Sequence, residues 1–229
     1  MPAVLVTGAS RGIGLEFVRQ FSADGWRVIA GCRQPQGAAE LAKLAAGSAG
    51  RVTVHPLDVL EHAGIDRLSA QLAQTPLDVL INNAGVGGQQ KFGEANYALW
   101  LETFRVNTLG PMKVAEAFAK QVAAGGEKKI VTLTSVMGSI GQNNLGGMYG
   151  YRSTKAAANA VMRSMAIDLK RLGIIAIAMH PGWVKTDMGG PQAQIDVATS
   201  VGGMRRVIAG LKREDSGSFL GYDGKQLPW

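Results

Sequence analysis

The sequence predicts an α/β fold with one doubly wound parallel sheet and helices on both of its faces. Apolar segments of strand length alternate with segments of helical periodicity from one end of the chain to the other. The strand segments are apolar throughout, which indicates burial on both faces. The 229 residues suffice for one domain, and no linker or internal repeat divides them, so residues 1–229 are expected to form a single unit.

The first half of the chain contains four predicted strands and three predicted helices. Its strands are short apolar runs at residues 3–7, 27–31, 51–57 and 77–82. Its helices have apolar residues at helical spacing and lie at 12–23, 38–46 and 64–73. In the first helix, Phe17 and Phe21 belong to one face, and Gly25 follows as a stop signal. The alternation of the two element types predicts parallel strand pairing.

The second half continues the alternation with a longer helical segment. Residues 99–123 form one predicted helix, in which Gly110 and Pro111 should bend or distort the middle because proline lacks an N–H. The remaining strands are predicted at 129–134, 174–179 and 218–222. The remaining helices are predicted at 151–172, which is rich in alanine and is followed by Gly173, and at 205–211, which is short.

The composition excludes several classes of protein. The longest apolar run after Gly173 covers residues 174–179, far below the ~20 residues of a membrane span. The N-terminus lacks the basic flank and the longer apolar region of a signal peptide. A single cysteine, Cys32, allows no internal disulfide and suits a reducing compartment. We therefore expect a cytoplasmic protein that has no membrane partner.

The formal net charge of +7 does not by itself predict a nucleic-acid-binding protein. Lysine and arginine are scattered, with only short pairs such as Arg205-Arg206, whereas nucleic-acid binders concentrate them in a stripe. The three histidines, His55, His62 and His180, show no metal-ligand spacing, so no metal site is expected. A phosphorylated small molecule would require only a local positive site.

A glycine-rich turn lies between the first predicted strand and the first predicted helix. Gly8, Gly12 and Gly14 allow a tight turn and a close approach of the backbone to a pyrophosphate at the helix N-terminus. Glycines also serve ordinary structural turns, which is the competing interpretation. The position between a strand and a helix favours dinucleotide binding and a Rossmann-type sheet.

Four motifs, in order along the chain, resemble those of the short-chain dehydrogenase/reductase family. The glycine-rich turn has the pattern T-G-x-x-x-G-x-G, and residues 82–85 read N-N-A-G. Tyr151 and Lys155 match Y-x-x-x-K, and residues 181–186 match P-G-x-V-x-T. Within the family, the glycine-rich segment before Tyr151 and the ending at 222–229 resemble the C-factor-like carbonyl reductases. The resemblance covers nearly the whole chain and implies an oxidoreductase.

Tyr151 and Lys155 are four residues apart, so they share one face of the predicted helix. A tyrosine with a pKa near ~10 is a poor acid–base group at neutral pH, and a neighbouring cation favours its phenolate. For these two residues alone, a surface pair at helical spacing is the simpler interpretation. The resemblance instead implies that Tyr151 is the general acid/base, and that Lys155 lowers its pKa and holds the nicotinamide ribose.

The resemblance also implies a catalytic serine and an asparagine. Ser135 follows the strand expected at 129–134, in the place of the family's catalytic serine, although the loop before Tyr151 is longer here than in the family. Ser139, within that loop, is the competing candidate. Asn107, on the long helix, resembles the asparagine that helps a water molecule link the lysine to solvent. A mid-helix asparagine is also often merely exposed.

The end of the second strand favours NADP(H) as the cofactor, with NAD(H) as the alternative. Cys32 stands where NAD-dependent relatives commonly have an acidic residue that binds the ribose. Arg11 and Arg33 could instead bind a 2′-phosphate through charge-assisted hydrogen bonds. The cofactor-binding residues that the motifs imply are Gly8, Ser10, Arg11, Gly12, Ile13, Gly14, Arg33, Asp58, Val59, Asn82, Ala84, Gly85, Tyr151, Lys155, Pro181, Gly182, Val184 and Thr186.

The reaction that the resemblance implies is hydride transfer between a nicotinamide cofactor and an aldehyde, ketone or quinone. The loop at 137–150 and the short segment after Thr186 favour an open, partly apolar pocket for such substrates. The expected partners are a small carbonyl or alcohol substrate and, by resemblance, further copies of the chain in a dimer or tetramer. The alternatives are an NADP(H)-binding sensor or signalling protein with little turnover and an NAD-dependent alcohol dehydrogenase.

Overall fold

In the computed structural model, which describes residues 1–88 and 90–229, seven parallel strands form one sheet. The strands are β1 (Ala3–Thr7), β2 (Arg27–Cys32), β3 (Val52–Pro56), β4 (Val79–Asn82), β5 (Lys129–Leu133), β6 (Ile175–His180) and β7 (Phe219–Gly221). Their order is β3-β2-β1-β4-β5-β6-β7, and every neighbouring pair is parallel. The strand order changes direction between β1 and β4, where ligands of such sheets bind. The predicted doubly wound fold is confirmed.

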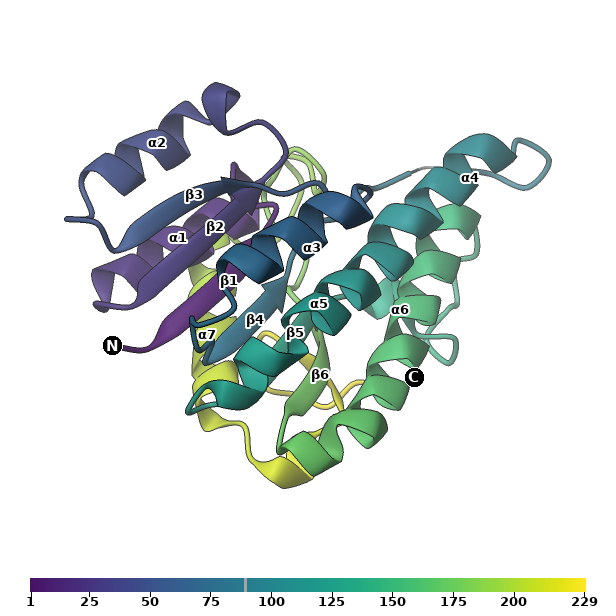
Figure 1. Ribbon diagram of the computed structural model, residues 1–229. Helices are drawn as coiled ribbons and strands as arrows, with labels where there is room; N and C mark the ends of the chain where they lie inside the picture. The colour runs from purple at the N-terminus through teal and green to yellow at the C-terminus, as the bar shows by residue number, and fades with distance from the viewer. Residues whose placement is uncertain (89) are drawn as a thin grey trace.

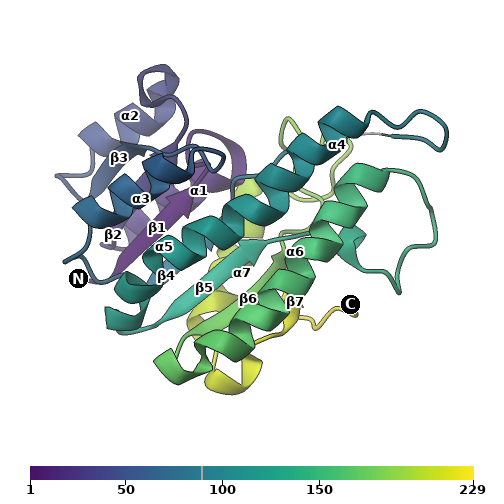
Figure 2. The ribbon, with the colours of Figure 1, turned by 45° about the vertical axis from the view of Figure 1, so that its right-hand side comes forward.

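Helices cover both faces of this sheet (Figure 1). They are α1 (Gly12–Ala23), α2 (Ala39–Ala46), α3 (His62–Gln71), α4 (Tyr97–Phe104), α5 (Gly110–Ala124), α6 (Tyr149–Asp168) and α7 (Val197–Gly210). The helices α1, α2 and α7 share one apolar cluster with one face of the sheet, and α3, α5 and α6 share a second cluster with the other face. The short helix α4 lies beside the N-terminal part of α6 (Figure 2).

Successive residues of a strand face opposite layers, which explains why the strands are apolar throughout. In β1, Val4 and Val6 belong to the cluster that contains Phe17 of α1, whereas Leu5 belongs to the cluster that contains Phe118 of α5. All five side chains are fully buried. A strand that is buried on both faces shows no alternation of polar and apolar residues, so an uninterrupted apolar run was the correct signal for it.

The long helix predicted at 99–123 is interrupted, as Gly110 and Pro111 indicated. A π-helical turn, Arg105–Leu109, joins α4 to α5. The N–H of Gly110 donates to the carbonyl oxygen of Arg105, five residues earlier. Pro111 has no N–H to offer the carbonyl group of Asn107, so the regular hydrogen-bond ladder of an α-helix cannot pass through this turn. The irregular turn thus contains one of the predicted site residues.

The last helix is longer than predicted. The expected helix covered residues 205–211, whereas α7 begins at Val197 and ends at Gly210. Asp196 caps its start, because the carboxylate accepts a hydrogen bond of 2.6 Å from the N–H of Thr199. Glycines in the middle of the segment obscured the helical pattern. Gly203 is nevertheless required there, since a Cβ would lie 2.5 Å from the carbonyl oxygen of Tyr222.

Helix α6 also differs from the prediction at both ends. It begins at Tyr149, two residues before the predicted start, and its predicted last residues form a separate 3₁₀ turn, Leu169–Leu172. Tyr151 therefore lies in the first turn of the helix and not at its boundary. In the part of the chain that the structure describes, no helix is long and apolar enough to cross a membrane.

Candidate active site

The predicted site residues lie at one edge of the sheet, mostly in the loops that follow its strands. Because all strands are parallel, their carboxyl ends share that edge. Gly8, Ser10, Arg11, Gly12, Ile13 and Gly14 follow β1; Arg33 follows β2; Asp58 and Val59 follow β3; Asn82, Ala84 and Gly85 end and follow β4; Ser135 follows β5; and Pro181, Gly182, Val184 and Thr186 follow β6. Tyr151 and Lys155 lie on α6, and Asn107 lies in the π-helical turn.

The glycine-rich turn has a backbone that favours glycine. Gly8 and Gly12 have left-handed φ angles of 66° and 54°. A Cβ on Gly14 would lie 2.2 Å from the carbonyl oxygen of Gly8, so α1 starts directly against the turn. The side chain of Arg11, the N-cap residue of α1, makes no capping hydrogen bond. The first N–H groups of α1 are therefore available to an anion, and the turn fits the pyrophosphate of a dinucleotide.

Two residues outside the predicted set join this turn to the loop after β4. The hydroxyl oxygen of Thr7 accepts hydrogen bonds from the N–H groups of Asn83 and Ala84, at 3.0 and 3.1 Å. The amide nitrogen of Asn83 donates to the carbonyl oxygens of Thr7 and Gly8, at 2.9 and 3.1 Å. The sequence contained the signal for both, since Thr7 opens the first motif and Asn83 belongs to N-N-A-G. Their bonds join the loops that follow β1 and β4.

The side chain of Asn82, in contrast, is directed into the fold. Its Nδ2 donates to the carbonyl oxygen of Pro111 at 3.2 Å and to the hydroxyl of Thr132 at 3.3 Å. These bonds join β4 to α5 and β5, and the residue is buried. The side chain therefore stabilises the sheet, and a cofactor contact of Asn82 would have to come from its backbone.

The loop after β6 crosses the glycine-rich turn. A Cβ on Gly12 would lie 3.5 Å from the methyl group of Thr186, and Arg11 forms an ion pair of 2.9 Å with Asp187. The two charged side chains are 75% and 79% exposed. Arg33 is also exposed, at the end of β2. Both arginines are therefore accessible to a phosphate group, and Asp187, which was not predicted as a site residue, competes for one of them.

Lys155 is buried beside the end of β5. Its Nζ donates a hydrogen bond of 2.9 Å to the carbonyl oxygen of Leu133 and lies 5.8 Å from the centre of the Tyr151 ring. Burial disfavours the charged ammonium group and lowers the pKa of Lys155 from 10.5 to about 8. Gly85 keeps the space around it open, since a Cβ there would lie 3.6 Å from Nζ and 3.3 Å from the side-chain oxygen of Asn107.

The phenol of Tyr151 has a pKa that is raised above 10.0. Burial is the main cause, and the nearby hydroxyl of Ser135 acts in the opposite direction. The neighbouring lysine was expected to lower this pKa, but burial disfavours the phenolate and raises it. The phenol is therefore protonated at neutral pH and can donate a proton to the oxygen of a ligand.

The two candidate serines have different surroundings. The hydroxyl of Ser135 lies beside the phenol of Tyr151. Ser139 is 1% exposed, and its hydroxyl donates to the carbonyl oxygen of Trp229 at 3.1 Å and accepts from the N–H of Gln142 at 3.2 Å. The hydroxyl of Ser139 thus joins two segments of the backbone, whereas that of Ser135 accepts from the N–H of Met137 at 3.1 Å and lies beside the phenol of Tyr151.

The side chain of Asn107 holds the loop after β4. Its Nδ2 donates to the carbonyl oxygen of Val86, and its Oδ1 accepts from the N–H of Val86, both at 2.9 Å. The Nδ2 also donates to the hydroxyl of Thr154 on α6, at 3.1 Å. Asn107 is buried, so these bonds fix the loop, the π-helical turn and α6 relative to one another.

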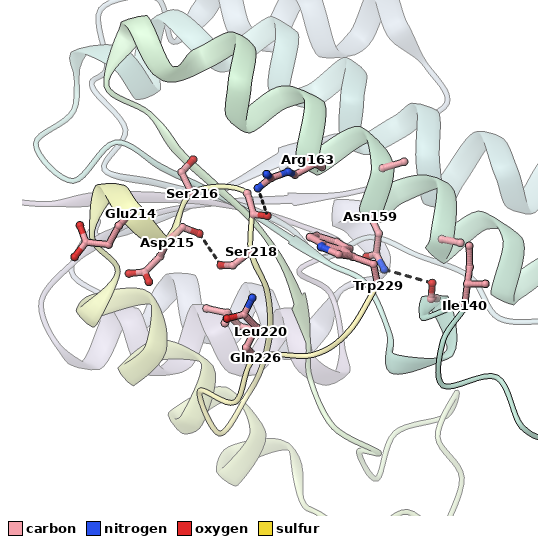
Figure 3. Close-up of a pocket in the computed structure, with 14 residues that line it drawn as sticks. Ile140, Asn159, Arg163, Glu214, Asp215, Ser216, Ser218, Leu220, Gln226 and Trp229 are labelled. Carbon is pink, nitrogen blue, oxygen red and sulfur yellow. Dashed lines mark hydrogen bonds between the residues drawn. The ribbon is translucent and has the colours of Figure 1, made fainter.

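A separate cavity of about 730 Å³ borders the loop that follows β5 (Figure 3). Arg163 of α6, Asp215 and Trp229 are among the residues that line it. Gly138, in the loop, lines it as well. A Cβ on Gly138 would lie 2.7 Å from the carbonyl carbon of Lys155, so loop and helix are in close contact there. None of the predicted catalytic residues is among those that line this cavity. It is therefore distinct from the candidate active site.

The groups that converge at the sheet edge suit proton transfer and phosphate binding. They are two hydroxyls, an ammonium group, two guanidinium groups and the N–H groups of the glycine-rich turn. Burial lowers the pKa of His180, at the end of β6, to about 4, so this residue is neutral at physiological pH. Among the described residues, no three His, Cys, Asp or Glu side chains gather as metal ligands.

This chain is similar to a known family, to characterised relatives and to solved structures. The family model for short chain dehydrogenase matches residues 2–195. C-signal of Myxococcus xanthus is 47% identical over 155 residues, which cover 67% of this chain and 93% of that protein. The 1-hydroxy-2-glutathionyl-2-methyl-3-butene dehydrogenase of Rhodococcus sp. (strain AD45) is 37% identical over 236 residues, which cover 100% of both chains. The NADPH-bound carbonyl reductase from chicken fatty liver has a TM-score of 0.94 at 36% identity, with coverage of 100% of this chain and 99% of that chain.

Proposed function

The chain belongs to the short-chain dehydrogenase family, and from this premise we propose that it interconverts a small carbonyl compound and its alcohol with NADP(H). One observation carries the proposal: Ser135, Tyr151 and Lys155 meet at the sheet edge that also holds the glycine-rich turn. The same edge thus offers groups for a dinucleotide and groups for proton transfer. In this proposal, residues 1–229 act as one domain that holds both cofactor and substrate.

The charges of the site favour NADP(H). The glycine-rich turn and the N-terminus of α1 would hold the pyrophosphate, and Arg11 and Arg33 would hold the 2′-phosphate. Asp58 and Val59 would border the adenine, and Lys155 would hold the nicotinamide ribose. The similarity to a carbonyl reductase that binds NADPH supports the same preference. When bound, the cofactor supplies or accepts the hydride.

The proton is handled by side chains of the chain itself. In reduction, the protonated phenol of Tyr151 donates its proton to the carbonyl oxygen of the substrate. Ser135 donates a hydrogen bond from its hydroxyl to the same oxygen. Lys155, with a pKa of about 8, is mostly charged at neutral pH, and its ammonium group stabilises the phenolate that the transfer leaves behind.

In this proposal, Asn107 helps to return a proton to the site through its backbone. The side chain of Asn107 is bonded to Val86 and Thr154. In a regular helix the carbonyl group of Asn107 would accept from the N–H of residue 111, but Pro111 has no N–H. A water molecule held between that carbonyl group and the ammonium group of Lys155 would connect the lysine to solvent.

The substrates are small aldehydes, ketones or quinones in this proposal. Exposed apolar side chains lie in the loops beside the site, among them Leu145 and Trp183. Met188, also exposed, lies against the loop after β4, where a Cβ on Gly87 would be 3.3 Å away. An open rim of apolar side chains suits varied carbonyl compounds, because the few polar groups orient only the reacting oxygen.

The assembly and the location of the protein are also proposals. A groove of about 480 Å³ between α5 and α6, lined by Met112, Val161 and Met165 among others, offers a surface through which two copies of the chain could pair. Light scattering in solution would measure the assembly. Cys32 is buried and unpaired with another cysteine, which suits the reducing cytoplasm.

The experiment that tests the function measures NADPH and NADH oxidation by the purified protein with a panel of aldehydes, ketones and quinones. In the variant Tyr151→Phe, turnover with NADPH should fall about 10²–10⁴-fold because the general acid is lost. The affinity for NADPH should be retained. Turnover that survives in Tyr151→Phe would show that Tyr151 is not the general acid. Absence of turnover with either cofactor would contradict the proposed enzymatic function.

The similarity to C-signal favours a second candidate function. That relative is named as a signal and is 47% identical over its aligned residues. An NADP(H)-binding sensor would need the glycine-rich turn but no turnover. Tight NADPH binding without turnover across the panel would favour it. The presence of Ser135, Tyr151 and Lys155 in one site favours the enzyme, because a sensor does not need all three.

A further inference from the structure

The helix that carries Tyr151 begins without a cap from its own N-cap residue. That residue is Met148, which makes no side-chain capping hydrogen bond and has a left-handed φ of 51°. The first turn contains no acidic residue. The first N–H groups of any α-helix lack partners within the helix, and burying one without a partner is costly. Tyr151 is the third residue of α6, so the anchoring of this turn determines where its phenol lies.

A glutamine from the loop before α4 supplies the missing acceptor. The Oε1 of Gln90 accepts a hydrogen bond of 3.0 Å from the N–H of Gly150, 60 positions away in the chain. The carbonyl oxygen of Gln90 accepts a second, of 2.8 Å, from the N–H of Met148. Its Nε2 donates to the carbonyl oxygen of Asn96 at 3.3 Å, and the residue is only 7% exposed. Gln90 therefore caps α6 from a distant segment.

The contact between Gln90 and α6 has little room to shift. A Cβ on Gly150 would lie 2.9 Å from the Oε1 of Gln90 and 3.4 Å from the Cγ of Trp100. Trp100 of α4 donates from its Nε1 to the hydroxyl of Ser153 at 2.9 Å, and Ser153 donates to the carbonyl oxygen of Gly150 at 3.2 Å. In Figure 2, α4 runs beside this part of α6. The first turn of α6 is thus held by Gln90 and α4 together.

We propose that Gln90 is a positioning residue for Tyr151, which it holds beside Ser135 by fixing the first turn of α6. The inference rests on the proposed function, in which Tyr151 is the general acid. Gln90 acts through the N–H of Gly150 and has no part in the proton transfer itself. Proton transfer requires the donor and the acceptor within hydrogen-bond reach, and a displacement of about 1 Å can cost ~10²-fold in rate.

Two substitutions at this position test the role of the acceptor oxygen. Gln90→Ala removes it, and kcat should fall about 10- to 100-fold while the Kd for NADPH changes by less than about twofold. Gln90→Glu keeps an oxygen for the N–H of Gly150 but loses the donor to the carbonyl oxygen of Asn96, so kcat should lie between that of Gln90→Ala and that of the wild type. Gln71→Ala, at an exposed glutamine at the end of α3, is the matched control and should leave kcat unchanged.

A second background separates positioning from a general loss of structure. In Tyr151→Phe, the additional change Gln90→Ala should cause no further loss of the residual rate, because the phenol through which Gln90 acts is absent. An equal loss in both backgrounds would overturn the inference.

Hydrogen exchange tests the cap without any turnover. The N–H groups at 148–151 should exchange faster in Gln90→Ala than in the wild type, whereas those of α1 should not change. Unchanged exchange at Gly150, in an enzyme that turns over, would overturn the inference and leave the proposed function intact. Faster exchange in a protein without turnover would instead show that the cap exists and that the proposed function fails.

Discussion

The glycine-rich turn and the first turn of α6 lie at the same edge of the sheet but acquire their properties in different ways. The shape of the glycine-rich turn depends mainly on its own residues: Gly8 and Gly12 have left-handed φ angles, and Gly14 leaves space for the carbonyl oxygen of Gly8. Asn83, in the loop after β4, adds hydrogen bonds to the carbonyl oxygens of Thr7 and Gly8. The ligands of the turn would bind to N–H groups, which nearly every residue has. A particular backbone is needed, and a motif of glycines describes it.

The first turn of α6 depends on partners that are distant in the chain. Its cap comes from Gln90, 60 positions away, and the ammonium group of Lys155 is held by Leu133, 22 positions away. Burial raises the pKa of Tyr151 and lowers that of Lys155 to about 8. A phosphate-binding turn thus requires a particular backbone, whereas a proton-transfer site requires particular surroundings, which no local motif describes.

The largest expected effect belongs to the first turn of α6 and its surroundings, where two serine variants should behave differently. Ser135→Ala should lower kcat about 10²–10³-fold, the usual effect of removing one hydrogen-bond donor to a reacting oxygen. Ser139→Ala should instead lower the free energy of unfolding by about 1 kcal/mol, because the carbonyl oxygen of Trp229 loses a donor. Steady-state kinetics and urea unfolding measure the two effects. The opposite pattern would transfer the catalytic role to Ser139.

On the side of the glycine-rich turn, Gly14→Ala should lower the free energy of unfolding by about 3 kcal/mol. The reason is that its Cβ would lie 2.2 Å from the carbonyl oxygen of Gly8. Gly37→Ala is the matched control, because a Cβ there meets nothing within 4 Å and φ is not left-handed. Thermal unfolding with and without NADPH measures both variants. A Gly14→Ala protein as stable as the wild type would show that the shape of the turn does not depend on Gly14.

The next effect concerns the charges beside that turn. Arg33→Asp places a carboxylate where the 2′-phosphate would bind, so the Kd for NADPH should rise about 10- to 100-fold with little change for NADH. Arg171→Asp, at an exposed arginine in the 3₁₀ turn after α6, is the control for net charge. Fluorescence titration with both cofactors gives the Kd values. Equal effects of the two variants would exclude Arg33 from the cofactor site.

Burial of Lys155 should make the stability depend on pH. Its pKa is about 8 in the folded protein and near 10.5 when exposed, so the unfolded chain binds more protons between these values. The contribution of Lys155 to the free energy of unfolding should therefore rise with pH above about 8, by at most ~1.4 kcal/mol per pH unit, while buried Cys32, whose pKa is raised, contributes in the opposite direction. Urea unfolding at several pH values from about 7 to 9, where few tyrosines have ionised, measures the rise.

Two lysine variants identify the source of this pH dependence. Lys155→Met should remove the rise, because the titrating group is absent. Lys43→Met, at an exposed lysine on α2, should retain it. A rise that persists in Lys155→Met would show that a group other than Lys155 causes the pH dependence.

The smallest expected effect belongs to the exposed ion pair of Arg11 and Asp187. Asp187→Asn frees the guanidinium group for the 2′-phosphate, and the Kd for NADPH should fall by less than about fivefold, because an exposed pair contributes at most about 1 kcal/mol. Asp66→Asn, in the separate ion pair with Lys113, is the control. Weaker binding of NADPH by Asp187→Asn would show that the carboxylate assists the site and does not compete in it.

The sequence predicted the architecture well because burial gives each helix or strand a pattern of apolar residues along a short segment. Apolar runs located all seven strands, and Pro111 located the irregular turn between α4 and α5. The start of α7 was missed, since Gly203 weakens the helical pattern for the sake of close packing against Tyr222. The start of α6 was missed because its cap lies in another segment. Prediction thus failed where one segment depends on another that is distant in the chain.

The sequence by itself determined the sheet, the glycine-rich turn, the tyrosine–lysine pair and the absence of an acid at the end of β2. Each of these is a property of residue type and spacing along a short segment. Only the tertiary structure decided that Ser139 is engaged with Trp229, that Asp187 meets Arg11 and that Gln90 caps the helix of Tyr151. Those contacts join segments that lie far apart in the chain at no regular spacing. The pKa values of Tyr151 and Lys155 follow from burial, which exists only after folding.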